Sequence, residues 1–103
     1  MAINITDLKA LAKACLSIVP TATGKDSEIE LWINMAIADM KRLGIAVENK
    51  ISDDLVKGAI MMYVRANFGN VNEKEKALCS TSYQMHVAEM SLSQEYKAVD
   101  ANV

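Results

Sequence analysis

The sequence has little of what marks several common protein classes. Its 103 residues include one histidine, one proline, two cysteines and only 5% aromatic residues, and the formal net charge is −2. Without clustered Lys and Arg, strong binding to phosphate backbones is not expected. No apolar run approaches the roughly 20 residues that span a bilayer, and the N-terminus lacks the basic and apolar regions of a signal peptide. We therefore expect neither a membrane span nor a signal peptide.

The two cysteines also argue against a disulfide or metal scaffold. Cys15 and Cys79 lie far apart and match no metal or redox spacing, and each sits within an apolar helical pattern. We expect both thiols to be reduced and buried in a cytosolic protein.

The apolar residues that are present, 51% of the chain, recur with the period of a helix. The pattern predicts one domain over residues 1–103, with an ordered core at about 5–92 and a flexible tail at about 93–103. The predicted helices cover residues 6–16, 26–43, 53–68 and 73–90. The connector after the second helix, residues 45–50, is predicted to be extended but too short to form a sheet.

Capping residues set the ends of the second and fourth helices. Ser27 with Glu30, and Asn72 with Glu75, fit the capping box, in which each side chain accepts a hydrogen bond from the other residue's backbone. Gly44 is predicted to end the second helix in a left-handed conformation.

The third helix is apolar around most of its circumference, which predicts burial on several sides. Its apolar residues are Leu55, Val56, Ala59, Ile60, Met61, Met62, Tyr63 and Val64. We expect Ser52 to cap this helix, Gly58 to allow close approach by a neighbour, and Gly69 to end it. The predicted fold is an all-α bundle of about four helices around this central helix.

The flanking helices are predicted to be amphipathic. The inward stripe of the second helix consists of Ile29, Ile33, Ala36, Ile37 and Met40. The fourth helix carries two apolar sides, one with Leu78, Met85, Ala88 and Leu92, the other with Tyr83, Val87 and Met90.

Three groupings could suggest chemistry, and none makes a credible catalytic, cofactor or metal site. Gly24-Lys25 precedes a helix, but the first glycine of a phosphate-binding loop and the Ser or Thr after the lysine are both missing. Cys79 and His86 are two turns apart, roughly 10 Å, which is too far for a nucleophile–base pair. Asp53-Asp54 is better read as a helix-dipole partner. We expect no enzyme and no cofactor.

Residues suited to a subunit contact are more evident. Arg and aromatic residues are favoured in interface cores. The more common alternative for Arg65 is a side chain that reaches the surface from the end of the buried helix. The candidate interface residues are Trp32, Arg65, Asn67, Phe68, Tyr83, Ser93 and Tyr96.

The order of segments resembles a known family. "AIADMKRLGI", "KGAIMMYVRANFGN" and the terminal "SLSQEY" are the most specific parts, and the likeness covers residues 5–96. The chain resembles the small head-tail connector proteins of tailed bacteriophages, also labelled DNA-packaging or head-completion proteins.

This resemblance implies a structural protein of the virion, made in the cytoplasm of the host bacterium. It implies a homo-oligomeric ring beneath the portal protein that extends the DNA channel, without sequence-specific DNA binding, and offers a platform for the tail or a second connector. It also implies that the C-terminal segment, from about Ser91 to Tyr96, docks on the portal.

The alternative from another class is a small dimeric DNA-binding regulator. Its recognition helix would be the fourth helix, with Lys74, Lys76 and Gln84, although that helix is poor in the side chains that read bases.

Overall fold

The computed structural model describes residues 5–19, 21–47, 54–69 and 71–92. It contains the helices α1 (Ile5–Cys15), α2 (Asp26–Arg42), α3 (Asp54–Asn67) and α4 (Glu73–Leu92). No strand occurs among the described residues, so the predicted all-α fold is confirmed. The helix bounds agree with the sequence-based ranges to within about two residues.

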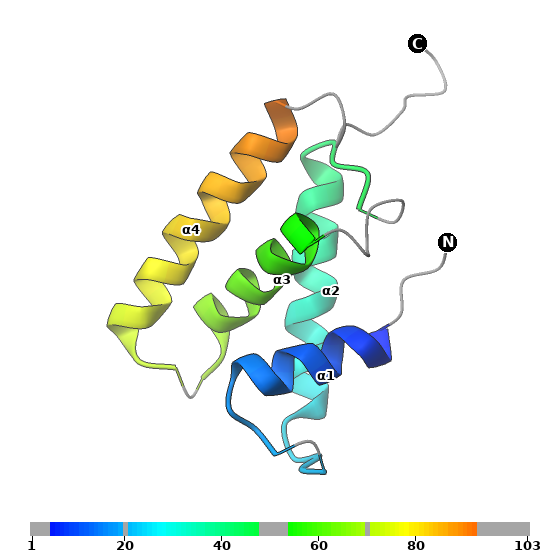
Figure 1. Cartoon of the computed structure of the whole chain (residues 1–103), viewed down its shortest axis with the longest axis vertical. Coiled ribbons are helices and arrows are strands. Elements are labelled where there is room, and N and C mark those ends of the chain that lie inside the picture. Colours follow the sequence, from blue (N-terminus) through cyan, green and yellow to red (C-terminus); the bar gives the residue numbers. More distant parts are fainter. Residues whose placement is uncertain (1–4, 20, 48–53, 70, 93–103) are drawn as a thin grey trace.

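α3 lies at the centre of the bundle. It packs against α4 on one side, against α2 on the other and against α1 near one end, and Figure 1 shows α4 and α2 flanking it. Its fully buried residues are Val56, Ala59, Ile60, Met61 and Val64. The prediction of a central helix buried by several neighbours is therefore confirmed.

α2 and α4 each bury one face against α3. The buried residues of α2 are the five predicted from the sequence: Ile29, Ile33, Ala36, Ile37 and Met40. Those of α4 are Cys79, Tyr83, Val87 and Met90. Truncating a fully buried Ile or Met in such a core to alanine costs about 2–5 kcal/mol, a large share of a small domain's stability.

The chain leaves α2 through the predicted left-handed glycine. Gly44 has a φ of 84°. The amide of Gly44 donates to the carbonyl of Lys41, and the amide of Ile45 to that of Met40, each at 3.0 Å. This pair of bonds is the Schellman motif. Ile45 and Val47 after it are each 1% exposed, so this part of the connector belongs to the core.

The predicted cap of α2 is wrong. Lys25 occupies the N-cap position, with no side-chain hydrogen bond, and Ser27 lies inside the first turn. Glu30 is not available to cap because its carboxylate pairs with Lys9 of α1 at 2.8 Å. Asp26 and Glu28 supply the negative charge that suits a helix N-terminus.

The predicted cap of α4 is confirmed in one half. The amide of Glu75 donates to the Asn72 side chain at 2.8 Å. The Glu75 carboxylate does not return to Asn72 but pairs with Arg65 of α3. Ser52 and Asp53, predicted at the start of α3, lie outside the described residues.

The predicted roles of Gly69 and Gly58 are wrong. α3 ends at Asn67, and Gly69 does not have a positive φ; its amide donates to the Glu28 carboxylate at 3.1 Å. A Cβ built at Gly58 meets no atom of the described residues within 4 Å, so none of the described helices approaches it closely.

The open space around Gly58 leads to a stability prediction. Gly58→Ala should raise the free energy of unfolding by up to about 1 kcal/mol, because alanine costs less entropy in a helix interior. Urea unfolding followed by circular dichroism measures the change. A destabilised variant would mean that the space beside Gly58 is filled in solution.

Candidate functional site

Two of the predicted interface residues lie in the core of the subunit. Phe68 is 1% exposed and Tyr83 is 6% exposed. Trp32 is half-buried at the edge of the core, its ring centroid 6.5 Å from that of Tyr63. In this conformation Phe68 and Tyr83 offer almost no surface to a neighbour, and their part in a subunit contact stays a prediction.

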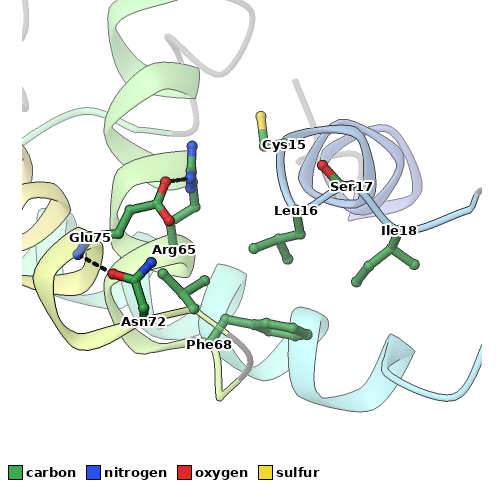
Figure 2. Close-up of a pocket in the computed structure, with 9 residues that line it drawn as sticks. Cys15, Leu16, Ser17, Ile18, Arg65, Phe68, Asn72 and Glu75 are labelled. Carbon is green, nitrogen blue, oxygen red and sulfur yellow. Dashed lines mark hydrogen bonds and ion pairs between the residues drawn. The ribbon is translucent and has the colours of Figure 1, made fainter.

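Arg65 lies at the corner where α3 turns into α4. Its guanidinium pairs with the Glu75 carboxylate beside an open pocket of about 270 Å³. Figure 2 shows this pair above Phe68 and facing the chain that leaves α1, with Leu16 and Ile18 on the opposite wall. The Arg65 Nε atom is buried and has no hydrogen-bond partner within the described residues.

Of the remaining predicted interface residues, one is bonded within its own helix and two lie outside the described residues. Asn67 is half-buried, and its side-chain amide donates to the Tyr63 carbonyl one turn earlier, at 2.8 Å. This bond ties Asn67 to its own helix. Ser93 and Tyr96 lie outside the described residues.

A partly buried hydrogen bond joins α4 to α2. The Tyr83 hydroxyl donates to Asp39 Oδ2 at 2.6 Å, and the Tyr83 ring packs edge-on against Tyr63 at 5.0 Å. Burial and the neighbouring carboxylate raise the pKa of Tyr83. Burial alone would raise the pKa of Asp39, but hydrogen bonds from Tyr83 and Arg42 lower it.

Removing this hydroxyl tests the link between the two helices. Tyr83→Phe should lower the free energy of unfolding by about 1.5 kcal/mol, the lower end for a hydrogen bond to a charged group, because Asp39 is partly exposed. Thermal unfolding measures the loss. An unchanged midpoint would show that Asp39 finds an equivalent donor without Tyr83.

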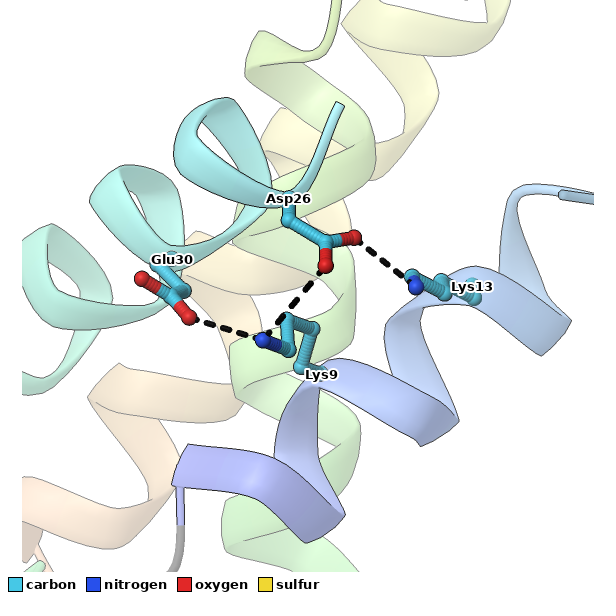
Figure 3. Close-up of polar contacts among 4 residues, drawn as sticks. All are labelled: Lys9, Lys13, Asp26 and Glu30. Atoms are coloured by element: carbon cyan, nitrogen blue, oxygen red, sulfur yellow. Dashed lines mark hydrogen bonds and ion pairs between the residues drawn. The ribbon is translucent and has the colours of Figure 1, made fainter. Parts of the chain in front are cut away.

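A cluster of four charged side chains joins α1 to α2. Figure 3 shows Lys9 and Lys13 of α1 reaching Asp26 and Glu30 of α2. The N–O distances are 2.8 Å for Lys9–Glu30, 2.8 Å for Lys13–Asp26 and 3.6 Å for Lys9–Asp26. We call these residues the α1–α2 ion-pair cluster. The pairing with Lys13 lowers the pKa of Asp26, and that with Glu30 raises the pKa of Lys9.

Of these four residues, only Glu30 was given a role from the sequence, as part of the cap of α2. The i, i+4 spacing of Lys9 with Lys13, and of Asp26 with Glu30, places each like-charged pair on one helix face. That spacing indicates a positive face on one helix and a negative face on another that could attract each other, although it does not say which helices pack together.

The lowered pKa values of Asp26 and Asp39 predict how the free energy of unfolding changes at acidic pH. In the unfolded chain these carboxyls recover their ordinary pKa of 3.8 and bind protons before the folded state does. Their stabilising contribution is present above that value and is lost as pH falls below it. Asp26→Asn should reduce this dependence on pH, as measured by urea unfolding between pH 3 and 7.

Glu73→Gln is the control for that experiment, because the Glu73 side chain at the start of α4 is 94% exposed and takes no part in the cluster. If both variants lost the same part of the pH dependence, the ion pairs of Asp26 would not be its source.

Within the part of the chain that the structure describes, the remaining polar groups show no arrangement for catalysis. His86 Nδ1 lies 2.7 Å from the Ser82 carbonyl of its own helix, an acceptor, so this nitrogen carries the proton. Cys79 is buried and Cys15 is half-buried, so the prediction of two buried thiols is confirmed only for Cys79. Among the described residues no three His, Cys, Asp or Glu side chains gather as metal ligands, and no helix is long and apolar enough to cross a membrane.

Comparison with known proteins supports the resemblance seen in the sequence. The model of a family described as "Phage connector protein" matches residues 10–97. A search of curated proteins and a search of solved structures each gave no match. The matched range includes α2, α3 and α4 completely and more than half of α1.

Proposed function

Because the chain belongs to the phage connector protein family, we propose that its copies form a ring that joins the phage portal to the tail or to a second connector. The ring extends the DNA channel and resides in the virion. The single observation that carries this proposal is the family match over residues 10–97, nearly the whole chain. The partners are further copies of the chain, the portal protein and the next protein toward the tail.

The subunit has the physical properties that this role needs. Its core is closed within one copy, since α3 is covered by the other helices and Phe68 seals the turn after it. The net charge of −2 suits a channel through which DNA slides, because a strongly basic lumen would hold phosphate. A ring also requires two different patches that meet between successive copies.

The native mass of the purified protein over a range of concentrations tests the ring. We expect a closed assembly of many copies that dissociates to folded monomers on dilution. A dimer that persists at every concentration would contradict the ring. For a protein that is monomeric by itself, co-assembly with its portal protein becomes the test.

Arg65 is a candidate for the contact between copies. Because it pairs with Glu75 within the subunit, a test of this contact requires a double variant as well as a single one. Arg65→Glu alone would place two carboxylates together and weaken the corner between α3 and α4, in addition to any effect on assembly. The double variant Arg65→Glu, Glu75→Arg restores an ion pair within the subunit while it reverses both charges.

We expect the double variant to recover the helical content and most of the thermal stability lost in Arg65→Glu, a difference of about 1 kcal/mol for a partly exposed pair. Its assembly, followed by analytical ultracentrifugation, should remain impaired. If the double variant assembled like the native protein, Arg65 would have no part in the contact.

A further inference from the structure

α4 carries an apolar face that no part of the described structure covers. Leu78, Met85 and Leu92 are 64%, 68% and 84% exposed. Thr81 and Ala88 complete the row, and both are exposed. The five positions recur at alternating steps of three and four, which is the spacing of a seam between two packed helices. The buried residues of α4, such as Tyr83 and Val87, lie on the opposite side of the helix.

α2 carries a second exposed row with the same spacing. Leu31 is 52% exposed, and Asn34, Ala38 and Lys41 follow at steps of three, four and three. The row lies opposite the buried stripe of α2 that faces α3. We call the two rows the α2 seam and the α4 seam. Since α3 separates the two helices, the seams lie on different sides of the subunit, as the arrangement in Figure 1 indicates.

On the basis of the proposed ring, we infer that the α4 seam of each copy packs against the α2 seam of the next copy. Figure 1 shows that α2 and α4 run in the same sense, while α3 runs opposite to them. We place the axis of the proposed ring nearly parallel to these helices, so that rotation about it keeps their sense from copy to copy. The α4 seam would therefore meet the neighbouring α2 seam as a parallel pair.

The side chains of the two seams fit each other in one register. If Leu78 faces Leu31, then Thr81 faces Asn34, and Met85 faces Ala38, because the steps along both helices are equal. The register thus places apolar beside apolar, two hydrogen-bonding groups together, and a large side chain against a small one. The seam from Leu31 to Lys41 is about 15 Å long at 1.5 Å per residue.

The charges agree with this register. In this register Lys41 faces Ala88. Glu89 is the next residue on α4 and would therefore lie beside the Lys41 side chain. Both Lys41 and Glu89 are exposed in the single subunit. An antiparallel pair of two α4 helices would also cover Leu78, Met85 and Leu92, but it would close at two copies and leave the α2 seam exposed.

Disulfide trapping between two differently labelled copies tests this contact. One protein carries Leu31→Cys and the other Leu78→Cys, both in a Cys15→Ser, Cys79→Ala background whose helical content is checked first. Facing positions of a tight helix pair lie within disulfide reach. Under mild oxidation we expect a disulfide-linked dimer in the mixture, at least tenfold more abundant than in either protein alone.

Val19→Cys replaces Leu78→Cys in the matched control, because Val19 is also 64% exposed and lies outside both seams. Equal trapping by Val19→Cys, self-trapping by Leu78→Cys, or no trapping in the mixture would each overturn the contact. If the native protein formed a closed assembly while the two cysteine variants gave no cross-link in the mixture, only the seam pairing would fail. A persistent dimer would contradict the ring as well.

A charge exchange gives a second test that requires no cysteine. Lys41→Glu and Glu89→Lys should each weaken assembly about tenfold, and the double variant should recover most of the loss. The melting temperature of the monomer serves as the control for folding. Additive losses in the double variant would show that the two residues do not meet.

Discussion

The burial of α3 is the constraint on which the rest of the structure depends. A helix with apolar residues around most of its circumference must be covered on several sides, and α1, α2 and α4 provide that cover. Each flanking helix buries one face against α3, and this contact fixes the direction in which its opposite face points. The opposite faces of α2 and α4 therefore point away from the centre, and it is these faces that carry Leu31 and Leu78.

Polar contacts then fix how the flanking helices sit on α3. The Tyr83–Asp39 bond joins α4 to α2, the pair of Arg65 with Glu75 fastens the corner after α3, and the α1–α2 ion-pair cluster holds α1. Such partly exposed ion pairs add little stability individually, so their main effect is on geometry. A subunit fixed in this way can present the same two surfaces to every neighbour in the proposed ring.

The sequence predicted the helices and their buried faces well because the hydrophobic period and the glycine stop after a helix are local properties. The inward stripe of α2 and the Gly44 stop were both confirmed. Two of the predictions that failed involved a residue whose partner is distant in the chain. Glu30 was expected to cap its own helix but pairs with Lys9, and the role of Gly69 depends on Glu28, which is 41 residues earlier. No local pattern contains those pairings.

The central claim is that the core is complete within one copy and that, in the proposed ring, copies meet through the outer faces of α2 and α4. The most direct test is a helix-resolution reconstruction of the assembled protein by electron microscopy. The account predicts a closed ring in which α4 of each copy runs parallel to α2 of the next. A ring whose subunits meet through α1, or an assembly in which α3 leaves its central position, would contradict it.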